Sequence, residues 1–461
     1  MGLFDSLKKA AGAKTAAPPT LTVPPPAKPK TEAPHANGIA QFSPPKNGST
    51  RHLLFVGGDE DWLGQVERDL AGLESNWNCS RATDCSQAME KWASGSFDTL
   101  ILDGNTTDGA KLLKTLEKEL AHSICIVRCQ TLDRATSSQW KGSGAALMAE
   151  DADAATLISS VKRSARIQDW LADAAIKQLV SQIRKLPAQP KLHTLVTDEL
   201  QSANGSMDTV GKLISQEPVM SAKILQVVNS AFFGLTREIS DSTESVMVLG
   251  AERIKALILL AGVFSQYSGA KCPGFSPEPV WSHSIQVGAF ARAIALAETK
   301  NARAAEAAFT AGLLHDLGKL VLAGNLPEMY DTVQRLKASK KITSREAELE
   351  ILGTSHAELG ACLLATWGLP LPILEALAWH HEPARSDEQG FTLLAAVHAA
   401  NIFAQESAAG DAPRDRIDIV YLQQAGLGDC RNRWREFCGL EPQQEDSAED
   451  QLRRRREAKA N

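Results

Sequence analysis

The spacing of apolar residues changes near residue 166, and this change constrains the fold more than any other feature of the sequence. In residues 52–166, short β-rich runs alternate with amphipathic stretches, a pattern typical of parallel strands joined by crossover helices. From about residue 169 to residue 440, apolar residues recur at helical spacing with almost no strand pattern. We therefore predict an α/β doubly wound domain followed by an all-α domain.

Composition divides the chain further. Residues 1–50 are rich in Pro and Ala after a short amphipathic start, and such a composition cannot bury enough surface to fold, so we expect a disordered tether. The remaining segments are predicted as the α/β domain at 51–166, a helical connector at 167–185, the all-α domain at 186–440 and a charged tail at 441–461.

Charge and cysteine content exclude some classes of protein. The net charge of -6 supplies no basic field, so nucleic acid is not an expected partner. The 8 cysteines are scattered without a C-x-x-C pair, which indicates reduced thiols. No long apolar run marks a transmembrane segment or a signal peptide, and we predict a cytoplasmic protein.

Asp103 comes directly after the buried run Thr99–Leu102. Working loops of a doubly wound domain lie at the carboxyl ends of its strands, so Asp103 is a candidate functional residue. The segment 51–166 resembles the receiver domain of two-component response regulators. That resemblance implies that Asp103 is the phosphoacceptor of a phosphorelay.

Other residues that receiver chemistry requires are replaced. Gly57–Gly58 stands where the family has an acidic pair, Cys129 where it has a hydroxyl residue, and Glu150 where it has a lysine. Magnesium prefers carboxylate oxygens, and a transferred phosphoryl group needs a cation beside it. The two glycines remove the carboxylates that would hold magnesium, and Glu150 replaces the cation. These changes favour a pseudo-receiver that serves docking or dimerisation, and phosphorylation at Asp103 is the alternative.

Histidines are concentrated in the second domain, where six of the 10 lie between residues 283 and 398. His and Asp together suit Fe, Mn, Zn or Ni, and a carboxylate can bridge two such ions. A metal-free network of hydrogen-bonded imidazoles is the alternative interpretation. The candidate ligands of a divalent metal are His283, His315, Asp316, His356, His380 and His381.

The run Ala311–Leu320, AGLLHDLGKL, matches the central motif of the HD phosphohydrolase superfamily. Around it, Leu186–Pro187, Ile224–Gly234 and Val248–Lys255 resemble the HDOD domain, an HD-related output domain. HDOD domains are regarded mainly as signalling modules whose enzymatic activity is generally unestablished. The resemblance implies an HD-type metal site at the six ligands, and within the motif Lys319 is a candidate phosphate contact.

Two positions depart from the HD-GYP phosphodiesterases that cleave cyclic dinucleotides. Pro279 stands where those relatives have a glutamate, and Asn401 where they have a final aspartate. The Gly-Tyr-Pro loop after His380–His381 is also missing. Neutral residues in place of two anionic ligands weaken the hold on paired dications.

We therefore predict a bacterial signal-transduction protein, a regulatory adaptor with a pseudo-receiver input and an HDOD output, without turnover. The helical segment near residues 153–184 would transmit the change that partner binding causes from the pseudo-receiver to the HDOD domain. Expected partners are signalling proteins such as a histidine kinase or a cyclic-dinucleotide enzyme, or a second copy of the chain. The alternatives are a metal-dependent phosphohydrolase or cyclic-dinucleotide phosphodiesterase, and a sensor that binds a nucleotide without cutting it.

Overall fold

The structure is a computed structural model of the chain. It describes residues 51–442, apart from residues 59, 73–76, 96, 117–122, 131–139, 141–144, 172, 184–186, 203–204, 231–236, 268–271, 387 and 408–415. The predicted tether, almost all of the predicted tail and residues 231–234 of the HDOD-like motif lie outside this description. Contacts divide the chain into Met1–Phe42 and Ser43–Asn461, and every described residue belongs to the second unit.

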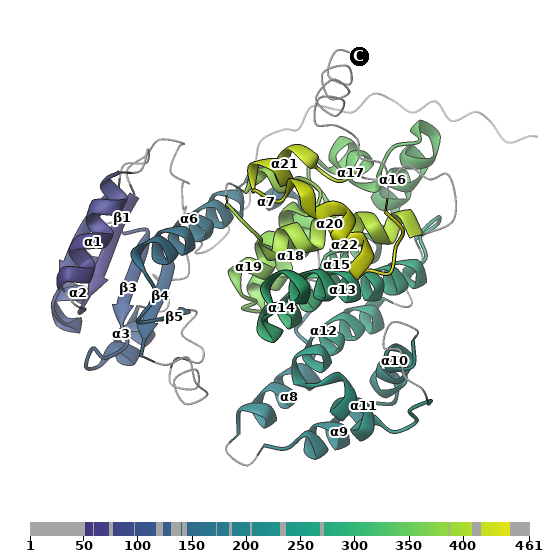
Figure 1. The fold of residues 1–461 in the computed structure, drawn as a ribbon, viewed down its shortest axis with the longest axis horizontal. Coiled ribbons are helices and arrows are strands. Elements are labelled where there is room, and N and C mark those ends of the chain that lie inside the picture. Colours follow the sequence, from purple (N-terminus) through teal and green to yellow (C-terminus); the bar gives the residue numbers. More distant parts are fainter. Residues whose placement is uncertain are drawn as a thin grey trace, which may run out of the picture. The chain divides into compact units, whose positions relative to one another are not determined.

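Five parallel strands form one sheet near the N-terminal end of the described chain (Figure 1). Their order is β2-β1-β3-β4-β5, which is one of the two common orders of doubly wound sheets. The predicted α/β class is compatible with this sheet. The strands are β1 (Arg51–Val56), β2 (Trp77–Ala82), β3 (Thr99–Asp103), β4 (Ile124–Cys129) and β5 (Ala146–Ala149).

Both faces of the sheet are buried. Neighbouring residues of β1 face opposite sides, so Leu53 and Leu54 belong to different apolar clusters. A sheet covered on both faces needs apolar residues at successive positions, which explains the continuous apolar run in β1. The helices are α1 (Glu60–Ala71) and α6 (Ala154–Leu171) against one face, and α2 (Cys85–Ser94) and α3 (Gly109–Thr115) against the other.

After α6, the described elements are all helical, so the prediction of an all-α second domain is confirmed. The side chain of Asp173 caps α7 by accepting hydrogen bonds from the first turn, and separates that helix from α6. The helices are α7 (Ala174–Gln182), α8 (Lys191–Gln201), α9 (Met207–Ser215), α10 (Pro218–Val228), α11 (Ser242–Leu249), α12 (Ala251–Tyr267), α13 (Pro277–Thr299), α14 (Ala302–Leu314), α15 (Leu317–Asn325), α16 (Pro327–Lys340), α17 (Ser344–Leu352), α18 (His356–Thr366), α19 (Leu371–Trp379), α20 (Leu393–Ser407), α21 (Ile419–Gln424) and α22 (Arg431–Phe437), with short 3-10 turns η2 (Pro383–Arg385) and η3 (Gly428–Cys430).

Glycine allows two of these helices to approach each other closely. A Cβ atom on Gly318 of α15 would lie 1.9 Å from the carbonyl oxygen of His356 at the start of α18. No side chain fits at that distance, so only glycine permits the observed contact. The contact brings the residues at the beginning of α15 next to the beginning of α18.

No helix that the structure describes combines the length and the apolar character that crossing a bilayer requires.

Candidate metal centre

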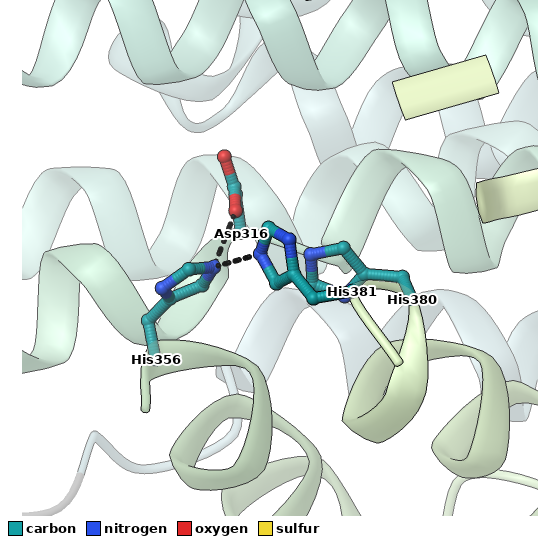
Figure 2. Close-up of side chains that lie close together, drawn as sticks. All are labelled: Asp316, His356, His380 and His381. Carbon is teal, nitrogen blue, oxygen red and sulfur yellow. Dashed lines mark hydrogen bonds and ion pairs between the residues drawn. The ribbon is translucent and has the colours of Figure 1, made fainter. Parts of the chain in front are cut away.

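The structure brings the six predicted metal ligands into one cluster. They form two groups of donor atoms, and within each group the atoms lie within 4.8 Å of one another. Asp316 belongs to both groups. The first, which we name the four-donor group, is drawn in Figure 2 and consists of Asp316, His356, His380 and His381; the second consists of His283, His315 and Asp316.

Helix ends supply most of these donors. His315 and Asp316 stand between α14 and α15, His356 begins α18, and His380–His381 follows the last residue of α19. His283 comes instead from within α13. Because the ends of several helices meet here, residues far apart in sequence point into a common space.

Asp316 is the central anion of the cluster. Its Oδ1 atom lies 3.0 Å from His356 Nε2, and its Oδ2 atom lies 2.6 Å from Lys319 Nζ. The same Oδ2 atom is 3.5 Å from His315 Nε2 and 3.9 Å from His283 Nε2. Burial by itself raises the pKa of this carboxyl, but its interactions with His315, Lys319 and His356 outweigh burial and hold the pKa well below its usual range. The residue is therefore a carboxylate at neutral pH.

His315 and His380 are held as neutral imidazoles with one nitrogen directed at the cluster. Each donates from Nδ1 to a backbone carbonyl one turn earlier, Gly312 O and Leu377 O respectively, both at 2.7 Å. Burial lowers the pKa of His315 to about 3 and that of His380 well below its usual value. The Nε2 atoms of both rings are buried and have no hydrogen-bond partner. Imidazoles in this tautomer offer the lone pair that a metal ion requires.

His356 is held by a buried carboxylate. Glu348 of α17 accepts hydrogen bonds at Oε2 from both the backbone N–H of His356, at 2.8 Å, and its ring Nδ1, at 2.6 Å. The hydroxyl of Tyr330 donates to the other oxygen at 3.3 Å. Burial lowers the pKa of His356, but the charges of Glu348 and Asp316 outweigh it and raise the pKa. A carboxylate behind an imidazole is the arrangement that orients histidine ligands of metals.

Three donor atoms of the four-donor group converge on one point. His356 Nε2 faces Asp316 Oδ1 at 3.0 Å and His381 Nε2 at 3.1 Å, as the dashed lines in Figure 2 show. The unpartnered Nε2 atom of His380 belongs to the same group. Nitrogen and carboxylate oxygen in this combination fit zinc, iron, manganese or nickel.

The second group is differently arranged. His283 Nε2 lies 2.9 Å from the amide oxygen Oδ1 of Asn401, which also accepts a hydrogen bond from Gln405 at 3.1 Å. An amide oxygen accepts only, so His283 donates from Nε2 and has no lone pair on that atom for an ion. Asn401 stands where the HD-GYP phosphodiesterases have an aspartate, and here its side chain accepts the hydrogen bond of His283.

Lys319 contacts Asp316 rather than standing free in solvent. Its Nζ atom is 2.6 Å from Asp316 Oδ2, and its side chain is 18% exposed. Helix positions three residues apart face each other, which accounts for the pair. The predicted phosphate contact of Lys319 stays a prediction.

His398, next to the cluster, is fully engaged by backbone. Its Nδ1 atom donates to the carbonyl of His380 at 2.7 Å, and its Nε2 atom accepts from the N–H of Asp418 at 2.9 Å. The ring therefore supports the position of His380 and is not a ligand.

Asp103 lies in the α/β domain at the end of β3 and takes no part in this cluster. Its Oδ1 atom accepts a hydrogen bond from the N–H of Asn105 at 2.8 Å. Beside it in the sheet register, Arg128 donates to the carbonyl of Glu150 at 2.6 Å and stacks on Trp62, 3.5 Å from the ring centroid. Phosphorylation of Asp103 stays a prediction.

Glu348 is the most important residue that sequence reasoning missed. It stands in an ordinary amphipathic stretch, and its carboxylate is recognisable as a partner of His356 only once α17 and α18 are folded together. No spacing rule in the sequence marks it.

Comparison with known proteins agrees with the helical fold. Residues 186–383 match the HDOD domain family, so the helical part of this chain contains an HDOD domain. This match lies in the helical part of the chain, which follows the parallel sheet in the sequence.

Individual relatives are distant. An uncharacterised protein of Treponema pallidum (strain Nichols) is 26% identical over 244 residues, which cover 52% of this chain and 46% of that protein. The match thus spans about half the length of the relative.

Among solved structures, an HDOD domain protein of unknown function from Geobacter sulfurreducens is 23% identical with a TM-score of 0.46, and the match covers 62% of this chain and 93% of the other. The response regulator MmoQ of Methylococcus capsulatus is 22% identical with a TM-score of 0.30, covering 56% of this chain and 96% of the other.

Proposed function

We propose that this protein is a bacterial signal-transduction protein whose HDOD domain holds one divalent metal ion and acts as a regulatory output without turnover. The observation that carries the proposal is the four-donor group. In it, the unpartnered Nε2 of His380 joins an oriented imidazole, His356, and a carboxylate, Asp316. The HDOD match supports the signalling role.

Charge favours one ion over two. Asp316 is the only carboxylate among the donors of the two groups, and Lys319 already neutralises part of its charge at 2.6 Å. Taking a second dication out of water without a further anion costs several kcal/mol. In addition, the hydrogen bond between His283 and Asn401 occupies a donor of the second group. We therefore assign the ion to the four-donor group.

When bound, a divalent ion supplies a Lewis acid and a fixed point for its ligands. In this chain the ligands come from the α14–α15 junction, the start of α18 and the end of α19. Binding would therefore hold three helix ends at fixed distances. A signalling domain can use such a restraint to set the shape of a partner-binding surface.

Metal analysis of the purified full chain tests the proposal. We expect close to one equivalent of metal in protein grown with iron, manganese and zinc and kept anaerobic, and none in the variant His315→Ala/Asp316→Ala. The variant His381→Asn, which changes a less buried ligand, should bind zinc more weakly while remaining folded. His193→Asn lies outside the cluster and is the control that should retain the metal. A metal-free wild-type protein would instead support the hydrogen-bonded network.

A hydrolase is the second candidate function. It is favoured by one observation, the presence of Asp316 in both donor groups, because a shared carboxylate can bridge two ions. Two equivalents of metal, together with hydrolysis of bis(p-nitrophenyl) phosphate or a cyclic dinucleotide that Asp316→Ala abolishes, would replace the proposal of a non-catalytic domain. Saturable nucleotide binding without product would support the sensor instead.

For the α/β domain we propose a receiver-like input that works without phosphorylation. The strand order supports it, since response-regulator receivers have the same order. A cytoplasmic location and partners such as a histidine kinase, a cyclic-dinucleotide enzyme or a second copy of the chain belong to the same proposal.

A further inference from the structure

Helix α6 carries two arginines that contact acidic residues near the end of the HDOD match. Arg163 Nε lies 2.7 Å from Glu375 Oε2, and Arg163 Nη2 lies 3.0 Å from Glu388 Oε2. Arg166 Nη2 lies 3.4 Å from an oxygen of each of the same two glutamates. We name these four residues the arginine clamp.

The clamp is largely shielded from water. The side chain of Glu375 is 3% exposed, and those of its two arginine partners are 16% and 22% exposed. Hydroxyl groups complete the arrangement: Ser386 donates to Glu375 at 2.9 Å, and Ser159 of α6 donates to Glu388 at 2.7 Å. A buried carboxylate left without its cationic partners strongly destabilises the fold around it. The conformation of the segment around Glu375 therefore depends on the position of α6.

The two glutamates flank the last two ligands of the four-donor group. Glu375 is part of α19, and this helix is directly followed by His380–His381. Glu388 comes shortly after them, beyond η2. The arginines of α6 therefore contact the chain on both sides of the two histidines, at Glu375 before them and at Glu388 after them.

The other face of α6 is part of the core of the α/β domain. Leu157 and Val161 of α6 pack in the same apolar cluster as Leu53 of the first strand. A displacement of α6 against the sheet thus moves the clamp arginines with it. Helix α6 thus connects the core of the sheet to the segment that carries two of the proposed metal ligands.

We propose that the arginine clamp regulates the metal site, an inference that rests on the proposed function. With the clamp closed, residues 371–388 hold His380 and His381 in the ligand positions. When a signal received by the α/β domain shifts α6, Glu375 loses its two arginine partners. The segment that carries His380 and His381 then rearranges, and its affinity for the metal ion falls. By linkage, ion binding in turn favours the closed clamp.

The test compares zinc affinity of the full chain, measured by competition with a chromophoric chelator. We expect Arg163→Met/Arg166→Met to bind zinc roughly tenfold more weakly than the wild type, within the usual range of coupling between sites. Glu388→Gln removes one acid without leaving a buried charge unpaired, and should weaken binding by a smaller factor.

The control is Arg253→Met/Arg292→Met. In the wild type these arginines pair with Glu306 at 2.8 and 2.9 Å, forming a similar cluster that does not involve α6. This variant should keep wild-type affinity.

Hydrogen exchange of residues 371–388 gives a second readout that needs no metal. It should rise in the Arg163→Met/Arg166→Met variant and stay unchanged in the control. If the wild type binds zinc and the clamp variants bind it equally well, the proposed regulation is wrong. If the wild type binds no zinc, the proposed function fails, and unchanged exchange in the clamp variant would then also overturn the clamp.

Discussion

Replacing Glu348 by glutamine should weaken the metal site without dismantling it. The glutamine oxygen can still accept from the backbone N–H and from Nδ1 of His356, and its amide can face Tyr330. What is lost is the negative charge behind the imidazole. Hydrogen bonds to charged groups contribute about 1.5–3 kcal/mol and neutral ones about 0.5–1.5 kcal/mol. Two such bonds are affected, and the relief of burying a charge offsets part of the loss, so we expect the free energy of unfolding to fall by about 1–2 kcal/mol.

The same change should reduce zinc affinity by about 10- to 100-fold, the usual effect of removing a residue that orients a histidine ligand. Chelator competition measures the affinity, and urea unfolding measures the stability. Glu348→Ala, which leaves two donors of His356 unpaired, should cost about 3–5 kcal/mol.

Glu350→Gln is the matched control, because Glu350 is an exposed acid of the same helix that pairs with Lys340. It should change stability by no more than about 0.5 kcal/mol and leave zinc binding intact. The reasoning is refuted if Glu348→Gln and Glu350→Gln bind zinc with equal affinity.

Three further predictions concern packing, pH and phosphorylation. Gly318→Ala should destabilise the protein by about 3 kcal/mol in urea unfolding because the new methyl group meets backbone. Gly64→Ala in α1 should not destabilise it, because there the methyl group meets only the end of the Arg68 side chain. Burial lowers the pKa of His193 from 6.5 to about 4, with Lys255 adding to the shift, so the stability that the neutral ring contributes is fully present above pH 6.5 and is lost as the pH falls toward 4. His193→Asn should flatten this dependence of the unfolding free energy on pH, and an unchanged profile would contradict the assignment. Acetyl phosphate should label neither the wild type nor Asp103→Asn on phosphate-affinity gels, and a wild-type band absent from Asp103→Asn would show a working phosphoacceptor.

Local patterns in the sequence were sufficient for the two domain classes. Apolar runs such as Leu53–Val56 mark strands buried on both faces, and helical periodicity marks the second domain. The candidate metal ligands could also be chosen in advance, because His315–Asp316 lies in a recognisable motif. The pair of Lys319 with Asp316 follows from helix geometry as well and could have been predicted.

Contacts between distant residues could not be predicted in the same way. Arg163 and Glu375 are 212 positions apart, and neither stands in a motif. Glu348 looks like any other acid on an amphipathic helix, although it is fully buried against His356. For such residues the decisive quantity is burial, and burial depends on which helices pack together.

The support that α20 gives to the cluster affects how the domain should be cut for expression. The family match ends at residue 383, and a fragment ending there would retain every predicted ligand. It would nevertheless lack His398, which holds the carbonyl of His380, and Asn401, which engages His283. In a fragment cut at the family boundary, His380 and His283 would therefore lack the residues that hold them in place. Its failure to bind metal would say little about the intact protein.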